Sequence, residues 1–391
     1  MRKQLASSGF LICMVAALVP VLAESGKTRP VKVKDLVIYQ DEQYYAAFPS
    51  LVVKKDGEIL CAFRRAPDRR RLWQAPGTTH TDPNSYLVLV RSRDQGNSWT
   101  AEPELIFAHP LGGSQDPCMN LLRNGTIVCS SYGWALLPAE TAERKKNTLS
   151  HPPFAFLGGY LLRSADGGRS WQGPILPPPT PGDQTLDALD RPVPAYNRGA
   201  MMEGRDGKLY WAVAANRAPQ DRRSSVHLMA SADRGTTWNY VGPIAQDEKV
   251  VFNETSLVET VRGDILAFLR TDKFEGKLAF ARSTDGGKSF QPWQDGGFFG
   301  HPFQAVRLKD GRIFLVYGYR RKPFGIRARL LDADGSDPAR AEEIVLREDG
   351  GSGDLGYPWA ALLKDGRILV AYYFNRENGT RHIAASLLEL R

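Results

Sequence analysis

Side chains that could bind a polar ligand or move protons are found among twelve residues that stand at fixed distances before six repeated turn glycines. Nine residues before the glycines are Phe48, Asp116, Arg198, Glu254, Pro302 and Tyr357. One residue earlier are Ala47, Gln115, Asn197, Asn253, His301 and Gly356. These positions combine carboxyl groups, a guanidinium, a phenol and an imidazole, and a polar binding pocket requires such a mixture. The alternative interpretation is simple exposure to solvent at strand ends.

The six glycines belong to a repeated signature, in which an apolar strand, a turn ending in glycine and a second apolar strand follow one another. The six copies are residues 51–63, 119–131, 201–214, 257–268, 303–317 and 359–372. In five of them the turn reads Asp-Gly or Asn-Gly. This dipeptide predicts a β-hairpin with a tight turn whose two central residues both take positive φ.

A second repeat lies downstream of the hairpins and follows the pattern Ser-x-Asp-x-Gly-x-Ser/Thr-aromatic. It occurs at residues 92–99, 164–171, 231–238 and 283–290, and a degenerate copy covers residues 332–335. Each complete copy follows a β-rich run, so we expect a turn between a third and a fourth strand. Its Asp and Ser can bond turn amides while the Gly takes positive φ and the aromatic residue packs inward.

Six units of about four strands, without helical periodicity, predict an all-β fold: a six-bladed β-propeller of four-stranded antiparallel blades. A propeller is favoured over a sandwich because radial repetition protects the strand edges. We expect the early strand at residues 33–39 to complete the last blade beside residues 382–390. The inner strands should then start at one end of the axis and bring the twelve positions together. A single domain should cover residues 30–391, with long loops at 136–153 and 174–194 on its faces.

Composition and the first residues limit the class of protein. With 391 residues, 42% of them hydrophobic, the chain can bury a large core and is not a disordered tail. A basic start at Arg2 and Lys3 precedes the apolar run 10–23, which predicts a signal peptide, residues 1–23, cleaved near Ala23 before secretion or release into a periplasm. An uncleaved membrane anchor is the alternative, but the run is shorter than a span of about 20 residues. Stable membrane insertion is therefore not expected.

The mature chain would carry three cysteines and a small positive charge. Without Arg2 and Lys3, the 51 basic residues become 49 against 43 acidic ones, a net charge of +6. This excess is too small and too little interleaved with aromatic residues to predict nucleic-acid binding. The odd number of cysteines leaves at least one free thiol, and buried, small apolar roles are expected for all three.

The four complete turns of the second repeat resemble the Asp boxes of the sialidase superfamily, and the resemblance extends over nearly the whole mature chain. It implies a six-bladed sialidase-like propeller with a glycan or oligosaccharide as its substrate. Asp boxes are structural turns that lie away from the central pocket and also occur in propellers without catalysis. They therefore imply the fold but no chemistry by themselves.

Two segments are similar to catalytic segments of the sialidases. Residues 253–259, followed by Arg270, resemble the segment in which a Glu precedes one arginine of the carboxylate-binding triad. Residues 356–358 resemble the segment with the tyrosine nucleophile. The resemblance implies Tyr357 as nucleophile, Glu254 as its base, and an exo-acting, retaining glycoside hydrolase that needs no cofactor. A carboxylate on the anomeric carbon would repel an anionic nucleophile, and a neutral phenol avoids that repulsion.

The same resemblance implies a general acid on the loop of the first blade. Asp82 is the nearest match, His80 is its competitor, and an Asp-Pro turn is the structural alternative for Asp82. Arg327 resembles the region that supplies another triad arginine, and Arg320 and Arg321 stand near enough to take its place.

The chain departs from the sialidase pattern at the first inner strand. Sialidases begin this strand with Arg-Ile-Pro, whereas residues 47–49 read Ala-Phe-Pro, so the first triad arginine is absent. Arg64 occupies the place in its hairpin that Arg270 occupies in the fourth, and Arg65 or Arg198 could also reach the centre. The departure leaves open whether the sugar is a sialic acid, a uronate or another acidic sugar.

Two further functions remain open. Because Ala47 is present, the chain could be a carbohydrate-binding propeller that has lost catalysis. It could also cleave a different acidic glycan with His80 or His301 as acid or base. The six histidines show no metal-ligand spacing, so no metal is expected. A run of five arginines would attract anions near the pocket or form a solvated loop: Arg64, Arg65, Arg69, Arg70 and Arg71.

Overall fold

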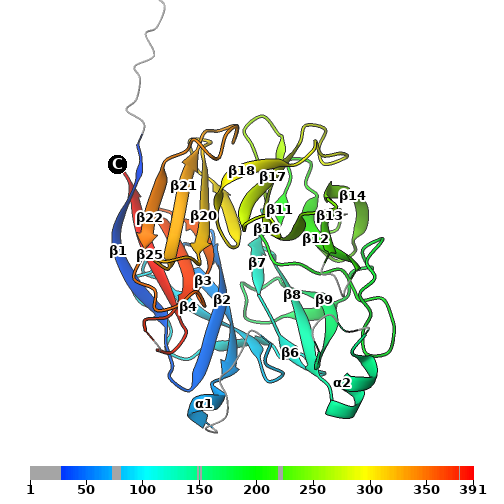
Figure 1. Ribbon diagram of the computed structural model, residues 1–391. Helices are drawn as coiled ribbons and strands as arrows, with labels where there is room; N and C mark the ends of the chain where they lie inside the picture. Colours follow the sequence, from blue (N-terminus) through cyan, green and yellow to red (C-terminus); the bar gives the residue numbers. More distant parts are fainter. Residues whose placement is uncertain (1–27, 73–80, 148, 150–151, 219–222, 378) are drawn as a thin grey trace, which may run out of the picture.

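The protein is an all-β, six-bladed propeller. The computed structural model describes residues 28–72, 81–147, 149, 152–218, 223–377 and 379–391. These residues form six antiparallel sheets, which follow one another around the molecule in chain order (Figure 1). The predicted fold class is confirmed. The signal peptide predicted for residues 1–23 and the residue His80 lie outside the described residues.

Each blade consists of consecutive strands, apart from the last one. The first blade contains β2 (Tyr44–Val53), β3 (Ile59–Pro67), β4 (Tyr86–Ser92) and β5 (Glu104–Phe107). The second contains β6 (Gly113–Ser114), β7 (Cys118–Leu121), β8 (Ile127–Leu136), β9 (Phe154–Ser164) and β10 (Gln172–Ile175). The third contains β11 (Met202–Glu203), β12 (Leu209–Ala218), β13 (Arg223–Ser231) and β14 (Asn239–Ala245).

The remaining blades complete the ring. The fourth contains β15 (Val251–Glu259), β16 (Ile265–Asp272), β17 (Lys277–Ser283) and β18 (Gln294–Phe299). The fifth contains β19 (Phe303–Arg307), β20 (Ile313–Tyr319), β21 (Gly325–Leu331) and β22 (Glu343–Arg347). The sixth contains β23 (Gly356–Leu362), β24 (Ile368–Phe374), β25 (His382–Leu390) and, from the start of the chain, β1 (Pro30–Tyr39).

The early strand closes the ring as predicted. β1 pairs antiparallel with β25 from Pro30 opposite Leu390 to Tyr39 opposite Ile383. In Figure 1 the described chain therefore begins and ends at the same end of the molecule. The first strand thus covers the edge of β25 and is itself the outermost strand of the last blade.

The six hairpins form as predicted, but their turns differ from the expected type. The turn glycines have φ between 79° and 97°. In the first blade, the Gly57 amide donates to the Lys54 carbonyl oxygen and the Lys54 amide donates to the Glu58 carbonyl oxygen, both at 2.9 Å. The residue directly before each of these six glycines does not have a positive φ. The connections are therefore four-residue turns that end in a left-handed glycine, rather than turns with two positive-φ residues.

The Asp boxes form the predicted turns between third and fourth strands. In the first box the Ser98 hydroxyl donates to Asp94 at 2.6 Å, and the Gly96 amide donates to the Ser92 hydroxyl at 2.9 Å. The other three boxes repeat these bonds. The aromatic residues pack into or against apolar clusters: Trp99, Trp171, Trp238 and Phe290. The boxes lie at the hairpin end, away from the starts of the inner strands.

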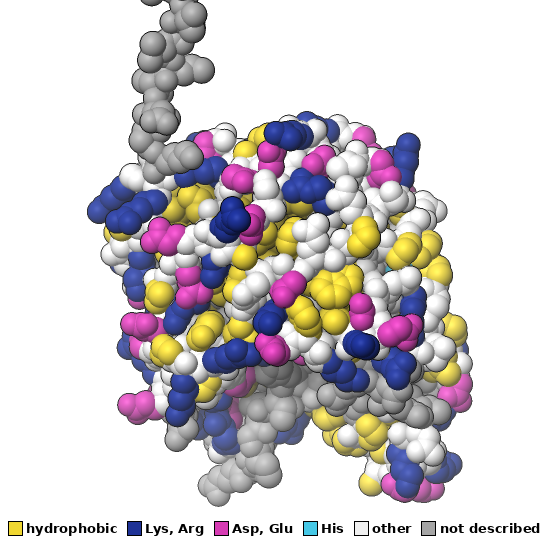
Figure 2. Space-filling model, turned by 45° about the horizontal axis from the view of Figure 1, so that its top comes forward, with side chains coloured by type: hydrophobic (Ala, Val, Ile, Leu, Met, Phe, Trp, Pro, Cys, Tyr) yellow, Lys and Arg dark blue, Asp and Glu magenta, His cyan; other side chains and the backbone are white. Residues whose placement is uncertain are grey.

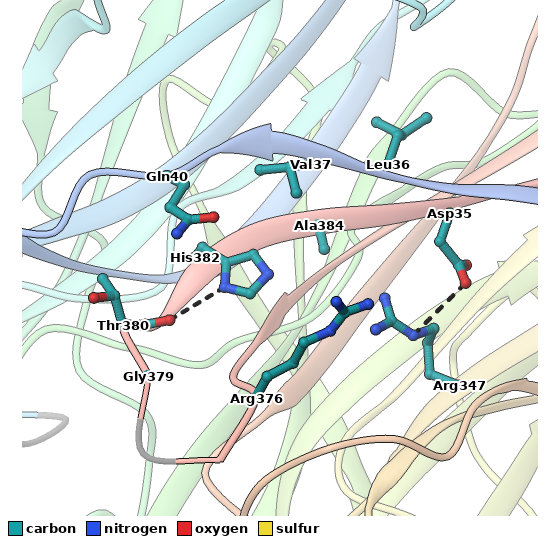
Figure 3. Close-up of a pocket in the computed structure, with 10 residues that line it drawn as sticks. All are labelled: Asp35, Leu36, Val37, Gln40, Arg347, Arg376, Gly379, Thr380, His382 and Ala384. Atoms are coloured by element: carbon teal, nitrogen blue, oxygen red, sulfur yellow. Dashed lines mark hydrogen bonds and ion pairs between the residues drawn. The ribbon is translucent and has the colours of Figure 1, made fainter.

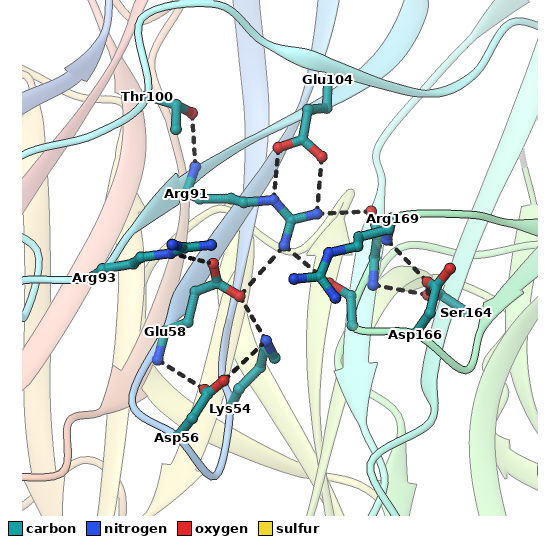
Figure 4. A network of polar contacts seen from close by, with 12 residues as sticks. Lys54, Asp56, Glu58, Arg91, Arg93, Thr100, Glu104, Ser164, Asp166 and Arg169 are labelled. Atoms are coloured by element: carbon teal, nitrogen blue, oxygen red, sulfur yellow. Dashed lines mark hydrogen bonds and ion pairs between the residues drawn. The ribbon is translucent and has the colours of Figure 1, made fainter.

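A buried arginine connects the first two blades beside the second Asp box (Figure 4). Arg91 donates to both carboxylate oxygens of Glu104, at 2.6 and 2.8 Å, and to the carbonyl oxygens of Gly167 and Gly168, both at 2.9 Å. In the fourth blade Arg282, which also precedes a box, donates to the Asp334 carbonyl oxygen at 2.6 Å in the fifth. The arginine before a box can thus bind the turn of the following blade.

The long loops lie at the end where the inner strands begin. Two short helices, α1 (Arg69–Leu72) and α2 (Ala139–Lys145), follow second strands and lie at this end in Figure 1. Within the described residues, neither these helices nor any other is long and apolar enough to cross a membrane. In Figure 2, which brings the opposite end forward, acidic and basic side chains are interspersed. Three cysteines are free and buried, as predicted: Cys61, Cys118 and Cys129.

Candidate active site

The structure brings Tyr357 and Glu254 together, although 103 residues separate them in the sequence. The Tyr357 hydroxyl donates a hydrogen bond of 2.6 Å to Glu254 Oε1. Arg270 Nη1 donates to both oxygens of Glu254, at 2.9 and 3.0 Å, and to the Tyr357 hydroxyl at 3.1 Å. The phenol and the carboxylate are buried. This cluster is the centre of the candidate site.

The backbone turns these side chains toward the axis through β-bulges at equivalent positions. The register shifts between Ala47 and Ser50, between Phe252 and Thr255, and between Gly356 and Trp359. Phe48 and Tyr357 take left-handed conformations there, with φ of 59° and 49°. Non-glycine residues adopt this region rarely, and bulges re-aim side chains next to active sites.

Two glycines allow close backbone contact at the same level. Gly356 has φ of 113°, and a Cβ there would lie 3.2 Å from Gly318 Cα. Gly199 has φ of 151°, and a Cβ there would lie 1.7 Å from the Thr255 carbonyl oxygen. The chain that follows Arg198 therefore passes directly against β15, which places Arg198 beside Glu254.

Burial keeps the phenol neutral while the carboxyl is ionised. Burial, and next the Glu254 charge, raise the pKa of Tyr357 far above its ordinary value. Burial also raises the pKa of Glu254, but the Arg270 charge and the hydrogen bond from Tyr357 outweigh it and hold that pKa below its ordinary value. The pair is thus a phenol that donates its proton to a carboxylate base, the arrangement of an activated nucleophile.

Two more arginines flank the ring of Tyr357. The guanidinium of Arg198 lies 4.6 Å from the ring centroid, and that of Arg320 lies 5.0 Å from it. Arg198 Nη2 donates to the carbonyl oxygens of Tyr357 and Pro49, at 3.1 and 3.3 Å, so this arginine of the third blade reaches the first and sixth blades. Arg320 donates to Tyr373 at 2.8 Å. These two guanidinium groups place positive charge beside the phenol ring.

Arg64 lies directly opposite Ala47 in the ladder between β2 and β3. Its side chain is fully buried, and its guanidinium lies 5.6 Å from the ring centroid of Tyr45 and 5.9 Å from that of Phe48. The ring of Phe48 in turn contacts that of Tyr357, with centroids 4.7 Å apart. The structure thus places a guanidinium next to the position of the missing triad arginine.

Asp116 joins the site from the connection between β6 and β7. The carboxyl is 2% exposed and accepts a hydrogen bond of 3.0 Å from the Tyr132 hydroxyl. It interacts electrostatically with Arg198 and Glu254. Burial raises the pKa of Asp116 to about 6, with the Glu254 charge adding to the rise and the Arg198 charge opposing it.

His301 lies at the edge of the same cluster. Its Nε2–H donates to the Thr271 carbonyl oxygen at 3.1 Å, and its ring stacks on Phe299 at 5.2 Å. Burial, and next the Arg270 charge, lower the pKa of His301 to about 3. The imidazole is therefore neutral at physiological pH, and one of its nitrogens is occupied by the backbone.

Three predicted residues bind partners other than Tyr357, Glu254 and Arg270, although Asp82 also acts electrostatically on Arg64. Asp82, 3% exposed, accepts from Arg69 through both oxygens, at 2.7 and 3.1 Å. Arg327 binds the Arg347 carbonyl oxygen and lies 3.5 Å from Glu343 at the outer side of the fifth blade. Arg65 pairs with Asp41 at 3.0 Å and stacks on Tyr44.

The arginine run is largely neutralised rather than open to anions. Besides the pairs of Arg65 and Arg69, Arg70 binds both oxygens of Asp68, at 3.0 and 2.6 Å. Arg64 is buried at the axis. The run thus divides between Arg64 at the site and the ion pairs of Arg65, Arg69 and Arg70.

Sequence reasoning missed two tyrosines that belong to a third set of equivalent positions. The residues seven positions after the turn glycines are Arg64, Tyr132, Ala214, Arg270, Gly318 and Tyr373. Tyr132 holds Asp116, and Tyr373 receives a bond from Arg320 and donates to Asp354 at 3.0 Å. Extending the spacing of Arg64 and Arg270 to all six hairpins would have found both tyrosines.

A cavity of about 290 Å³ opens beside the cluster, between the second, third and fourth blades. Glu254, Arg270 and Arg198 form one side of it. Aromatic rings and amides form the rest: Tyr132, Trp134, Phe156, Tyr196, Asn197, Asn216 and Asn253. Aromatic faces combined with a few polar groups are typical of sites for small organic ligands. A sugar ring would find both kinds of contact here.

Another cavity lies at the outer edge of the last blade and contains none of the predicted site residues (Figure 3). It lies between β1, β25 and the chain after β24. Arg347 binds both oxygens of Asp349 and lies 3.7 Å from Asp35, and Arg376 lies 3.4 Å from Asp349. His382 faces the Thr380 carbonyl oxygen at 3.1 Å. The arginines of this cavity are thus paired with Asp349 and Asp35.

Comparisons with known proteins agree with the repeat pattern. The family described as BNR repeat-like domain matches residues 155–370. A sialidase from Micromonospora viridifaciens is 26% identical over 258 residues, which cover 62% of this chain and 35% of the sialidase. The chain thus spans about a third of the length of this curated relative.

Solved structures share the whole propeller. A protein of unknown function from Dyadobacter fermentans is 55% identical, with a TM-score of 0.90, and the match covers 93% of this chain and 99% of that one. An α-L-arabinanase from Penicillium chrysogenum, solved with arabinobiose, has a TM-score of 0.61 at 14% identity, covering 92% of this chain and 98% of that one. The second likeness shows the fold alone.

Proposed function

The chain belongs to the BNR repeat-like domain family, and from this premise we propose that it is an exo-acting, retaining glycoside hydrolase that removes a terminal acidic sugar from glycans. The hydrogen bond of 2.6 Å between Tyr357 and Glu254, with Arg270 bound to both, is the observation that carries the proposal. A buried phenol that is neutral at rest and bonded to a carboxylate base suits attack on an anomeric carbon.

In the first step the Tyr357 oxygen forms a bond to the anomeric carbon, and its proton passes to Glu254. The glycosidic carbon–oxygen bond breaks, and the leaving oxygen takes a proton from an acid of the enzyme. In the second step a water attacks the same carbon and gives a proton to the acid that was deprotonated in the first step, while the bond to Tyr357 breaks and the phenol regains its proton from Glu254. Two inversions at one carbon retain its configuration.

The charges around the phenol support an anionic sugar. Four arginines lie around Tyr357 or the rings that contact it: Arg64, Arg198, Arg270 and Arg320. Glu254 and Asp116 are the carboxyl groups of the described residues that act on the phenol. The arginines interact with further carboxyl groups, Arg64 with Asp82, Arg270 with Asp272 and Arg320 with Asp354. The guanidinium groups gathered around the phenol suit a ligand carboxylate, which arginine can bind through two parallel hydrogen bonds.

A sialic acid and a uronate are the two classes of acidic sugar that fit this proposal. Ala47 stands where sialidases have an arginine, and Arg64 lies opposite it in the neighbouring strand. Export, through cleavage of the segment 1–23, belongs to the same proposal and rests on the sequence of that segment. The enzyme would then meet its glycan outside the cytoplasm.

Replacement of Tyr357 tests the mechanism. We expect Tyr357→Phe to lower turnover by about 1,000-fold or more, because the nucleophile is lost while the ring contacts remain. The assay is release of 4-methylumbelliferone from its α-sialoside, its β-glucuronide and its α-L-arabinofuranoside. Tyr372→Phe is the matched control, because that hydroxyl bonds Ser386 at 2.8 Å on the other face of β24. Equal turnover by wild type and Tyr357→Phe would remove the mechanism.

A carbohydrate-binding propeller without catalysis is the second candidate, and Ala47 is the observation that favours it. An array of sialylated and uronate-containing glycans separates the two candidates. Binding on the array with no product released from the bound glycan supports the second candidate. Release of the terminal sugar by wild type, and its loss in Tyr357→Phe, supports the hydrolase.

A further inference from the structure

The proposed reaction needs a proton donor, and the geometry of Asp82 does not suit that task. Both of its carboxylate oxygens accept hydrogen bonds from Arg69, at 2.7 and 3.1 Å, and Oδ1 also accepts from the Asn84 amide at 2.8 Å. A general acid must present a protonated oxygen to the leaving group. In Asp82 each oxygen is occupied by a cationic donor.

Asp116 has the free oxygen that Asp82 lacks. Its carboxyl is 98% buried, and Oδ2 accepts from the Tyr132 hydroxyl at 3.0 Å. Within the described part of the chain, Oδ1 has no hydrogen-bond partner. An unpartnered carboxyl oxygen in a buried site is costly unless a ligand or a proton satisfies it.

The position of Asp116 is that of a group inside the site. It interacts electrostatically with Arg198 and Glu254, and it acts on the phenol of Tyr357 in the same way. Tyr132, which fixes its orientation, lines the cavity beside Glu254. We propose that Asp116, rather than Asp82, is the proton donor and acceptor of this site; the inference rests on the proposed hydrolase function.

The environments of the two buried carboxyls separate their roles. Burial raises the pKa of Asp116 to about 6, so the group holds a proton in mildly acidic solution. Glu254 lies against Arg270, and its pKa is below its ordinary value. Two carboxyl groups whose pKa values are pushed apart are the usual arrangement of an acid and a base in one site.

The proton balance is complete with these groups. In the first step Asp116 gives its proton to the leaving oxygen as the glycosidic bond breaks, and Glu254 receives the proton of Tyr357. In the second step Asp116, now a carboxylate, takes a proton from the attacking water, and Glu254 returns a proton to the tyrosine. Each group ends in its starting state, and no co-reactant beyond water is needed.

The pH profile should be bell-shaped with an acidic optimum. Activity rises as Glu254 loses its proton below its ordinary pKa of 4.5, and it falls as Asp116 loses its proton near pH 6. The described charged and titratable groups that act on Asp116 are Arg64, Cys118, Tyr132, Arg198, Glu254 and Tyr357. Of these groups, only Glu254 loses its proton below pH 7, and that titration forms the acidic side of the pH profile.

The first test needs no substrate. In protein labelled with ¹³C at the aspartate carboxyls, we expect one resonance to titrate near pH 6. That resonance should be missing in Asp116→Asn and present in Asp82→Asn. A resonance that titrates near pH 6 but disappears in Asp82→Asn, or the absence of any such resonance, would overturn the assignment even if the enzyme proves active.

The second test uses the dependence on the leaving group. Phenyl and 4-nitrophenyl glycosides of N-acetylneuraminic acid and of glucuronic acid differ in their need for protonation. We expect Asp116→Asn to lose about 100-fold in kcat/KM on the phenyl glycoside but less than tenfold on the 4-nitrophenyl glycoside, and to lose the alkaline limb near pH 6. Asp82→Asn should keep the wild-type ratio between the two substrates.

The outcomes separate this inference from the proposed function. Equal losses on both glycosides in Asp116→Asn, or a steeper leaving-group dependence in Asp82→Asn, would assign the proton transfer elsewhere while the hydrolase proposal stands. If wild type releases neither phenol nor 4-nitrophenol from either sugar, the hydrolase proposal fails for these substrates. The carboxyl titration then still decides whether Asp116 carries a proton.

Discussion

At the scale of single residues, the site is an arrangement of arginines around one phenol. Arg270 holds the base, Arg198 crosses from the third blade to the backbone of Tyr357, and Arg320 flanks its ring from the fifth blade. Each guanidinium also binds a protein carboxylate, carbonyl or hydroxyl, which fixes its orientation before a ligand arrives. A preorganised site of this kind loses little conformational entropy when an anionic sugar binds.

Replacement of Ala47 by arginine tests whether Arg64 takes the place of the missing triad arginine. Ala47 is fully buried and lies opposite Arg64, so Ala47→Arg adds a second guanidinium to a filled space. We expect it to lower the free energy of unfolding by about 2 kcal/mol or more, without a gain in sialoside turnover. Urea unfolding and release of 4-methylumbelliferone from its sialoside are the measurements.

The double variant Ala47→Arg with Arg64→Ala is the control, because it moves the cation instead of adding one. It should recover much of the lost stability. If Ala47→Arg alone unfolds at the same urea concentration as wild type, the space opposite Arg64 is open, and Arg64 does not substitute for the triad arginine.

Spacing predicted the site residues on inner strands better than those on loops. Tyr357 and Glu254 follow the repeat, so equal distances from the turn glycines located them, whereas Arg270 on the second strand of its blade was identified through the sialidase resemblance. Arg320 and Arg327 could not be ranked, because strand alternation after the hairpin decides which of them faces the axis. The partner of Asp82 could not be predicted either, since the pairing with Arg69 depends on how the irregular chain between them folds back.

At the scale of elements, repetition fixes each turn but the contacts between blades are made individually. The Asp boxes were predictable because Ser, Asp and Gly bond within eight residues. The exact type of the hairpin turn was not predictable, since Asp-Gly suits both a two-residue turn and a longer turn that ends in a left-handed glycine. The bond of Arg91 to the carbonyls of the next box joins residues 76 and 77 positions apart, a separation that the repeat does not reveal.

Replacement of Arg91 tests how much one blade contact stabilises the ring. The side chain is 8% exposed, and Arg91→Ala leaves Glu104 and two carbonyl oxygens without their donor (Figure 4). We expect the free energy of unfolding to fall by about 3 kcal/mol. Arg91 also lies 3.4 Å from Glu58. Arg93→Ala is the matched control, because Arg93 pairs with the same Glu58 at 3.0 Å but is 76% exposed, and it should cost no more than about 0.5 kcal/mol.

Urea unfolding followed by tryptophan fluorescence measures both variants. Because Arg91 lies at the hairpin end, kcat/KM of the folded Arg91→Ala protein should match that of wild type. Equal losses of stability in the two variants would show that the buried contact between blades contributes no more than an exposed ion pair.

At the scale of the whole molecule, the ring depends on its first strand. The sequence predicted this closure, because the last unit lacks a fourth strand and residues 33–39 lack a hairpin of their own. β1 is mostly exposed, so it stabilises the last blade through the hydrogen bonds of its ladder with β25 more than through burial of apolar side chains. It also connects blades, since Lys32 donates to the Leu346 carbonyl oxygen at 2.7 Å in β22.

Removal of residues 1–39 should therefore uncover the edge of β25 without disturbing the inner strands that carry Tyr357 and Glu254. We expect the shortened chain to melt at a lower temperature and to self-associate through the open edge, whereas removal of residues 1–27 alone should not. Light scattering and thermal unfolding measure both effects. A synthetic peptide of residues 28–40 should restore the monomer and the melting temperature, because it can re-form the ladder, and a scrambled peptide should not. A shortened chain that stays monomeric and melts with the full chain would show that three strands suffice for the last blade and that closure by the first strand is dispensable.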